Sequence, residues 1–594
     1  MNQNDTKNAQ EDKESSPKLG LALSGGGFRA SFFHIGVLAQ MAELGLLRHV
    51  EVISTVSGGS IIGALYYLHV KKLLDNSKNK TIDNRAYVNI VQKIEVDFLK
   101  AVQRNIRMRT FCNPIKNIRM SRANYSRSDR LGELYDKYFY RKVFDEDRKT
   151  MIQMRELKIF PDSKDFYPRR DNIGRDPKVP ILLLNATTLN TGHNWRFTAS
   201  RMGEPPRTDE LAKDIDKNVR LRRPLSYDDI VKGQQDVELG LAVAASACVP
   251  GLFHPLALSG LYPRNIRVQL VDGGVHDNQG IQGLLDEDCT LFVISDASGQ
   301  MGDEPDPSTG ITSVVLRSNS ILMDRVREEQ IFRLYEKCDL DASRIALMHL
   351  QKGVKTEEIP WINVDSRPAE KTREEWTSET KSTDFGVAEP VQKALSRVRT
   401  DLDSFTNVES YSLMLDGYQM SAHEINKAKG IRGLIDTTPQ IKDVKWHFST
   451  VKNWMEDPGP TYQKHLSVAG ERLFKVFRLS KSLSIVTVII SVIILAWLFI
   501  SFGKNIVDIF SWFMSAGPLL VLALLLVLII LPKILRPFKL PVWVLSIIEF
   551  PVNFIFRGLL PALASLFVCL HLWIFDYLFI KLGKVERLGT KPQK

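Results

Sequence analysis

Two glycine-rich turns near the N-terminus constrain the fold of this chain more than any other feature. The first is Ser24-Gly25-Gly26-Gly27-Phe28-Arg29 and the second is Ser57-Gly58-Gly59-Ser60. Each turn follows a short apolar run, at 20–24 and 50–56, and precedes a stretch whose apolar residues recur at helical spacing. Repeated strand–turn–helix units predict a mainly parallel sheet that is covered by helices.

Further apolar runs extend this pattern along the chain. Residues 181–188, 268–271 and 291–295 are short and apolar, as expected for buried strands. The run at 268–271 leads into a third glycine turn, Asp272-Gly273-Gly274. We therefore expect an α/β fold whose sheet carries three special turns.

The composition of the chain does not decide between a membrane surface and a nucleic acid as its partner. The chain has 594 residues, with 79 Lys and Arg against 68 Asp and Glu, and a formal net charge of +11. This excess fits an anionic membrane surface or a nucleic acid equally well. The five cysteines are widely spaced, with no CxxC pair, so they indicate neither a disulfide framework nor a zinc site. Residues 1–17 are polar and lack the apolar core of a signal peptide, so we expect a disordered tail on a cytosolic domain.

The three turns, in this order, resemble the three signatures of the patatin-like phospholipases. The small-residue stretch Ala244-Ala245-Ser246-Ala247-Cys248-Val249-Pro250 is similar to a helix that this family carries before its aspartate. The resemblance covers about residues 18–417. It implies a three-layer α/β/α fold, a lipid acyl hydrolase activity, and a Ser-Asp dyad that needs no histidine, metal or cofactor.

Ser57 is the expected nucleophile. It lies between an apolar strand and a helix, where a sharp turn exposes the hydroxyl at a helix N-terminus. Gly59 lets that helix pack closely. The family usually has glycine two residues before the serine, where this chain has Thr55. Two alternatives stay open: Ser57 caps the helix only, or Ser60 is the nucleophile.

Asp272 is the expected base, as the resemblance implies. An aspartate with its ordinary pKa near ~4 is a weak base, so a buried site has to raise that pKa. The alternatives are a turn aspartate before Gly273 and Gly274, or a catalytic role for His276.

The first glycine turn is the expected oxyanion hole. Backbone amides of Gly25, Gly26, Gly27 and Phe28 can form a concave nest for an anion, because glycine permits the required dihedral angles. Arg29 matches a basic position of the family and either orients the loop or fixes a phosphate or carboxylate. A nucleotide-binding loop is the alternative, but no Gly-Lys-Ser/Thr follows.

Residues 71–178 are strongly charged and are expected as an insertion. Arginines and lysines alternate there with apolar residues between 98 and 130. The pattern fits an amphipathic surface on anionic headgroups or a solvated helical face. Nucleic acid is disfavoured, since no known binding motif accompanies the charge.

The C-terminal region predicts membrane spans. Residues 483–502, 510–531 and 559–580 are each long and apolar enough to cross a bilayer, and 540–556 is a weaker candidate. Basic clusters flank these segments, so placing every cluster in the cytosol requires an even number of crossings. Four spans, or two spans and a re-entrant segment, meet that condition; a buried helical bundle of a soluble fold is the alternative.

The sequence thus predicts a multi-pass integral membrane protein whose catalytic domain faces the cytosol. We expect it to cleave ester-linked fatty acids of a phospholipid or lysophospholipid. An acyltransferase or transacylase with the same dyad, and a membrane scaffold with a vestigial hydrolase domain, are the alternatives. The expected parts are a tail (1–17), a hydrolase domain (18–417), a helical linker (418–482), membrane helices (483–582) and a basic tail (583–594).

Overall fold

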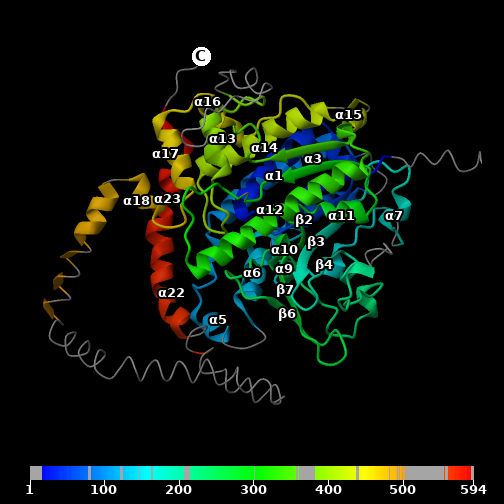
Figure 1. Ribbon diagram of the computed structural model, residues 1–594, viewed down its shortest axis with the longest axis horizontal. Coiled ribbons are helices and arrows are strands. Elements are labelled where there is room, and N and C mark those ends of the chain that lie inside the picture. Colours follow the sequence, from blue (N-terminus) through cyan, green and yellow to red (C-terminus); the bar gives the residue numbers. More distant parts are fainter. Residues whose placement is uncertain are drawn as a thin grey trace, which may run out of the picture.

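A central mixed sheet organises the chain in the computed structural model (Figure 1). The structure describes residues 17–77, 82–120, 125–145, 147–161, 165–206, 214–299, 301–355, 359, 382–436, 440–480, most of 482–501, 554 and 559–589. Within these residues nine strands form one sheet, in which β3, β2, β1, β8 and β9 are parallel neighbours. β4, β5, β6 and β7 pair antiparallel beside β3. The predicted α/β fold with a mainly parallel sheet is confirmed.

The strands are short and mostly buried. They are β1 (Leu19–Leu23), β2 (Val50–Val56), β3 (Ile181–Thr188), β4 (Asn194–Phe197), β5 (Met202–Gly203), β6 (Leu256–Leu258), β7 (Val268–Asp272), β8 (Leu291–Asp296) and β9 (Ile345–His349).

The helices of the main body lie between and after these strands. They are α1 (Gly27–Glu43), α2 (Gly58–Asn76), α3 (Asn84–Val102), α4 (Ile106–Arg109), α5 (Pro114–Arg119), α6 (Arg127–Tyr135), α7 (Pro168–Asp171), α9 (Leu239–Ser246), α10 (Gly274–Asp277), α11 (Ile281–Asp286), α12 (Ile311–Lys337), α13 (Glu389–Ser396), α14 (Asn407–Lys427), α15 (Lys429–Asp436), α16 (Lys452–Glu456) and α17 (Pro460–Ala469). Towards the C-terminus follow α18 (Lys475–Leu479), α22 (Leu560–His571) and α23 (Tyr577–Leu582).

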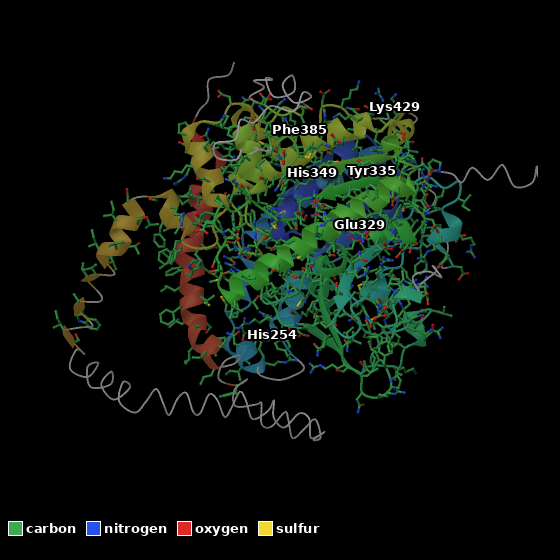
Figure 2. All side chains as sticks on the ribbon, viewed as in Figure 1. His254, Glu329, Tyr335, His349, Phe385 and Lys429 are labelled. Atoms are coloured by element: carbon green, nitrogen blue, oxygen red, sulfur yellow. The ribbon has the colours of Figure 1, made fainter. Side chains whose placement is uncertain are left out.

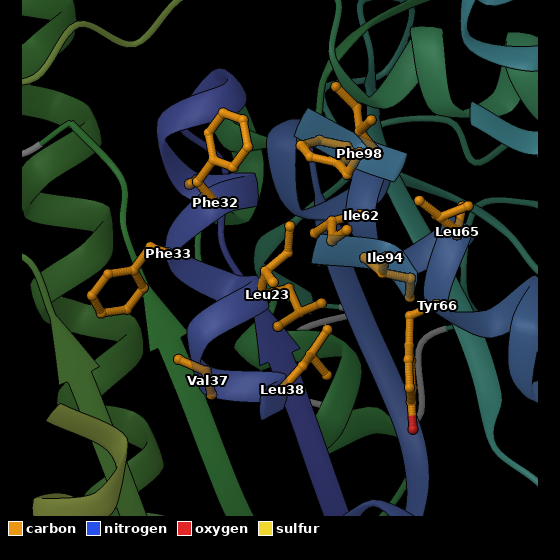
Figure 3. Close-up of a cluster of buried hydrophobic side chains, with 14 of the residues drawn as sticks. Leu23, Phe32, Phe33, Val37, Leu38, Ile62, Leu65, Tyr66, Ile94 and Phe98 are labelled. Carbon is orange, nitrogen blue, oxygen red and sulfur yellow. The ribbon is translucent and has the colours of Figure 1, made fainter. Parts of the chain in front are cut away.

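Helices cover both faces of the sheet because β1 alternates its side chains between two cores. Leu21 and Leu23 of β1 point into the larger core, under α1, α2 and α3. Figure 3 shows Leu23 there, among Phe32 of α1, Ile62 of α2 and Phe98 of α3. Ala22 points to the smaller core, which includes residues of α11 and α12. In Figure 2, Glu329 and Tyr335 lie along α12 where it crosses in front of the sheet.

The predicted domain limit at 417 and the predicted insertion at 71–178 both involve residues of this packed core. Residue 417 lies inside α14, where a Cβ on Gly417 would be 2.2 Å from the Phe33 carbonyl oxygen of α1. α14 is therefore a core helix along the length of α1. The charged segment 71–178 contains α3, whose Phe98 is fully buried in the larger core, so part of this segment is core rather than surface.

One C-terminal helix is apolar enough to cross a membrane. Within the described residues this is Leu560–Leu582, which comprises α22, a π-helical turn and α23. Leu566, Phe567 and Trp573 are more than two-thirds exposed on it. The predicted segment 510–531 lies outside the described residues, as does 540–556 apart from Phe554, and 483–502 is described only in part. A multi-pass arrangement therefore stays a prediction.

The same helix is held against the main body by polar contacts. Asn117 Nδ2 donates to the Pro561 carbonyl oxygen at 3.0 Å, and Asn105 Nδ2 donates to Asp576 Oδ1 at 3.1 Å. The Ser404 hydroxyl also donates to Asp576 Oδ1. The helix thus docks beside α4 and α5 at the left of Figure 1.

Candidate active site

The register of β3 brings Ser57 and Asp272 together. β2 runs parallel to β3 and ends with Val56 opposite Asn185. β7 runs antiparallel to β3 and ends with Asp272 opposite Ala186. Because β4 occupies the other edge of β3, β2 and β7 take successive stretches of one edge and meet end to end. Ser57 and Asp272 therefore lie at adjacent positions of the sheet, although they are far apart in the sequence.

Ser57 has a strained backbone that depends on close packing. Its φ of 49° and ψ of −117° are unusual for a residue with a side chain, and such conformations cost about 1–3 kcal/mol. A Cβ on Gly58 would lie 2.0 Å from the Gly27 carbonyl oxygen, and one on Gly59 would lie 2.1 Å from that of Leu23. The first residues of α1 and α2 are thus in contact, so two helix N-termini favour negative charge beside Ser57.

A chain of buried hydroxyl groups holds this turn. The Ser57 amide donates to Ser246 Oγ at 3.0 Å, which lies 2.8 Å from Ser60 Oγ. Ser60 Oγ lies 2.9 Å from Thr55 Oγ1, which donates to the Leu183 carbonyl oxygen at 2.9 Å. In this order every hydroxyl accepts one hydrogen bond and donates one. Ser60 is fully buried and occupied within the chain, which speaks against it as the nucleophile.

Thr55 fits the turn because α2 has a glycine opposite its methyl group. A Cβ on Gly63 would lie 2.6 Å from Thr55 Cγ2. The departure from glycine at position 55 is therefore accompanied by a small residue one helical turn beyond Gly59. The Thr55 hydroxyl in turn ends the buried chain on the neighbouring strand β3.

The two oxygens of the Asp272 carboxylate differ in their hydrogen bonding. Oδ1 accepts a hydrogen bond from the Gly274 amide at 2.8 Å. Oδ2 is buried and makes no hydrogen bond of ordinary geometry with the residues described. Burial raises the pKa of Asp272 to about 6, while the Gly274 amide and the Ser57 hydroxyl act in the opposite direction. The raised pKa makes this carboxylate a stronger base than an exposed aspartate, and Oδ2 is the oxygen that the Gly274 amide does not hold.

The first glycine turn offers two amides rather than four. The Gly25 amide donates to the Asn278 carbonyl oxygen, and the Phe28 amide donates to the Asp401 carbonyl oxygen, both at 2.9 Å. Gly26 and Gly27 have φ angles of 134° and 58°. No hydrogen bond of their amides is found within the described part of the chain. Since the Gly25 and Phe28 amides already donate to carbonyl oxygens, the amides of Gly26 and Gly27 are the two of the predicted four that an oxyanion could use.

The predicted supporting residues shape the loops. Arg29 is buried and donates to the Ala297 carbonyl oxygen through Nε at 3.2 Å and Nη2 at 3.0 Å. Its Nη1 donates to the Val398 carbonyl oxygen at 2.7 Å, so Arg29 orients two loops. The Gly273 amide donates to the Ser246 carbonyl oxygen at 3.2 Å, which ties the aspartate turn to α9. Burial lowers the pKa of His276 to about 4, so this imidazole is neutral at pH 7.

Asn278 lies where the turns meet, and a cavity opens beside it. Its Oδ1 is 2.3 Å from a Cβ built on Gly25 and 2.6 Å from one built on Gly274. A cavity of about 240 Å³ extends from Asn278 along α12, with Met323 and Arg327 in its wall. Asn278 escaped prediction because no motif marks it. Ser246 lies in the stretch similar to the family, yet its hydrogen bond to Ser57 depends on the folded packing.

A family model and two curated proteins match the part of the chain that carries the glycine turns. The family model described as "Patatin-like phospholipase" matches residues 21–285, a span that contains all three glycine turns. The resemblance expected from these turns is confirmed over that span. Among curated proteins, the chain is similar to "Lysophospholipase 2" of Saccharomyces cerevisiae, with 25% identity over 276 residues, 42% of this chain and 36% of that protein. "Lysophospholipase 3" of the same yeast is 25% identical over 197 residues, 30% of this chain and 28% of that protein. The chain spans about a third of the length of these relatives.

Two solved structures are similar to the chain at a lower level. Human GIVD cytosolic phospholipase A2, in complex with a methyl gamma-linolenyl fluorophosphonate inhibitor and terbium chloride, has a TM-score of 0.33 and 11% identity over 71% of this chain and 60% of its own. VipD from Legionella pneumophila has a TM-score of 0.22 and 12% identity over 78% of this chain and 84% of its own. At these TM-scores the likeness adds no argument. The matched family model and both yeast relatives are named for phospholipase or lysophospholipase activity.

Proposed function

We propose that this chain hydrolyses fatty-acid esters of phospholipids or lysophospholipids through Ser57 and Asp272. The observation that carries the proposal is the strained Ser57 beside the buried Asp272 carboxylate, whose Oδ2 makes no hydrogen bond of ordinary geometry with the described residues. A strained serine at a helix N-terminus is the arrangement that serine hydrolases use. A pKa of about 6 leaves Asp272 ionised at neutral pH and ready to accept a proton.

In the first step, Ser57 Oγ attacks the ester carbonyl carbon and its proton passes to Asp272 Oδ2. The carbonyl oxygen becomes an oxyanion, which the free amides of Gly26 and Gly27 and the N-termini of α1 and α2 stabilise. The ester C–O bond then breaks, and Asp272 returns the proton to the leaving alcohol oxygen. In the second step water attacks the acyl-Ser57 carbonyl carbon and gives one proton to Asp272. Asp272 passes this proton to Ser57 Oγ as the bond between Oγ and the acyl carbon breaks, which releases the fatty acid and restores the serine hydroxyl and the carboxylate.

We also propose that the enzyme works at a membrane. The apolar helix Leu560–Leu582 supports this, since Phe567 and Trp573 project from it unburied. Its polar contacts to Asn105 and Asn117 would keep the main body close to a bilayer that receives the helix. A membrane location raises the effective concentration of an insoluble substrate. The cytosolic side is proposed from the basic residues that flank the apolar segments.

Fatty-acid release from mixed phospholipid vesicles tests the proposed function. Purified full-length wild type should release fatty acid, and Ser57→Ala and Asp272→Asn should reduce release at least ~10³-fold, as loss of a nucleophile or its base does. Reaction with a fluorophosphonate probe should follow the same order. Release by Ser57→Ala at the wild-type rate would remove Ser57 as the nucleophile. Acyl transfer to an added alcohol in preference to water would instead support a transacylase.

A further inference from the structure

The segment between α13 and α14, residues 397–406, lies against the first glycine turn, and we call it the connecting segment. Its Asp401 carbonyl oxygen accepts a hydrogen bond from the Phe28 amide at 2.9 Å. A Cβ on Gly27 would lie 2.7 Å from the same oxygen and 2.9 Å from the Asp401 nitrogen. Arg29 Nη1 donates to the Val398 carbonyl oxygen at 2.7 Å. The position of the Asp401 backbone therefore limits where Gly27 and Phe28 can lie.

The same segment contacts the C-terminal apolar helix. The Ser404 hydroxyl donates to Asp576 Oδ1, and both side chains are buried. Just beyond the segment, the Val408 amide donates to the Gly583 carbonyl oxygen at the end of α23, at 3.1 Å. Ser404 follows Asp401 by three residues, which span at most about 10 Å of chain. A short stretch thus joins the oxyanion turn to the C-terminal helix.

Lys475 of α18, which precedes the apolar residues 483–502, binds to the same place. It forms an ion pair with Asp403, and its Nζ donates to the Ser404 carbonyl oxygen at 3.2 Å. The Nζ also lies 4.3 Å from the centre of the Phe579 ring of α23. Figure 1 shows α18 and α23 side by side. Residues before and after the apolar C-terminal region therefore meet on Asp403 and Ser404.

A buried arginine holds the connecting segment in one arrangement. The Arg399 side chain is fully buried, with Nε 2.9 Å from Asp403 Oδ1 and Nη1 2.6 Å from Glu409 Oε1. Its Nη2 donates to the Ser404 carbonyl oxygen at 2.8 Å. Buried polar networks whose groups are paired make a segment rigid. A displacement at Ser404 is therefore passed along the segment to Asp401 rather than absorbed between them.

We propose that Ser404 and Asp576 are positioning residues for the reaction. Their hydrogen bond fixes the connecting segment, which in turn holds the Gly26 and Gly27 amides where they can receive the oxyanion. The contact acts through the Asp401 backbone and not on the substrate. The seating of the C-terminal helix and the reactivity of Ser57 are thereby linked. This inference rests on the proposed function, because the oxyanion hole has a role only in that reaction.

Hydrogen exchange of the purified full-length protein tests the link without relying on catalysis. Ser404→Ala removes the donor, and Asp576→Leu removes the acceptor from the helix side. Peptides that contain the Phe28 amide should exchange about tenfold faster in both variants, as expected when a hydrogen bond to a carboxylate is lost. Unchanged exchange of these peptides in both folded variants would overturn the proposal.

Ser412→Ala is the matched control for this measurement. It also removes a buried hydroxyl, which lies 2.6 Å from the Tyr462 hydroxyl, but Ser412 belongs to α14 and not to the connecting segment. Peptides with Phe28 should exchange in this variant as they do in the wild type. Equal acceleration by Ser412→Ala would show a general loss of stability and contradict a positioning role for Ser404.

The kinetics of labelling by a fluorophosphonate probe separate positioning from binding. In Ser404→Ala and Asp576→Leu the maximal labelling rate should fall about tenfold at an unchanged half-saturating probe concentration, because oxyanion stabilisation acts in the transition state. The double variant should lose little more than either single variant, since both remove one contact. A higher half-saturating concentration with an unchanged maximal rate would contradict the assignment. No labelling of the wild type would instead contradict the proposed hydrolysis, and the exchange measurement would still decide whether Ser404 and Asp576 hold the turn.

Discussion

Replacing Ser246 by alanine should slow the reaction of Ser57 although Ser246 is not expected to touch the substrate. The substitution removes the oxygen that accepts the Ser57 amide at 3.0 Å, in a place that water does not reach. A buried amide without an acceptor costs about 1–3 kcal/mol. The Ser57 conformation is itself strained by about 1–3 kcal/mol, so losing its support is enough to favour a relaxed backbone. Each 1.4 kcal/mol spent on restoring the reactive conformation lowers the rate about tenfold, so a 10- to 100-fold decrease is expected.

Ser60→Ala provides the matched control, since it removes one hydroxyl from the middle of the same chain. It leaves Ser246 Oγ in place to accept the Ser57 amide. Both variants should lose a similar free energy of unfolding, about 1–3 kcal/mol, but only Ser246→Ala should react slowly with a fluorophosphonate probe. Labelling rates at several probe concentrations, with denaturant unfolding of the same samples, measure both effects. Equal labelling rates for the two variants would refute the idea that Ser246 positions Ser57.

Four further predictions concern the protonation of Asp272, the packing of the Ser57 turn and the C-terminal helix. If ionised Asp272 is the base, kcat/KM should fall tenfold per pH unit below a pKa of about 6 and level off above it, which a pH–rate profile checks. Burial raises the pKa of Asp272 above its value in the unfolded chain, so the free energy of unfolding falls as the pH rises through this pKa. Near pH 7.5, Asp272→Asn should therefore increase the free energy of unfolding by up to about 3 kcal/mol, which denaturant unfolding measures. Gly63→Ala should cost about 1–3 kcal/mol by pressing on the Thr55 methyl group, and Thr55→Ser should restore much of that in a double-mutant cycle of unfolding free energies. Asp576→Leu should leave Asn105 and Ser404 without an acceptor and speed the proteolysis of the C-terminal helix, whereas the exposed Glu586→Gln should not.

Local patterns were sufficient to predict the parallel sheet and the position of Ser57. A strand, a glycine turn and a helix follow one another within a few residues there, so neighbours in the sequence determine the geometry. The antiparallel β7 could not be predicted, because pairing with the free stretch of β3 depends on where β2 ends.

The details of the site depended on contacts between distant segments. Four amides were predicted for the oxyanion hole, but the carbonyl groups of Asn278 and Asp401 occupy those of Gly25 and Phe28. Both acceptors lie more than 250 residues from the glycine turn in the sequence. No pattern in the residues around the turn predicts these contacts. The role of Thr55 was hidden for the same reason, since the sequence shows an exception at that position but not the glycine that accommodates it.

Because β2 and β7 meet end to end on β3, the relative position of Ser57 and Asp272 does not depend on the lengths of the segments between the strands. The relative position of Ser57 and Asp272 is specified by two consecutive peptide units, at Asn185 and Ala186, and by no loop. Segments between the strands can therefore gain or lose residues while the dyad stays in place. Residues that contact substrates or partners can therefore change within these segments. A chain that is cut within one of them should still bring Ser57 and Asp272 together when its two fragments associate.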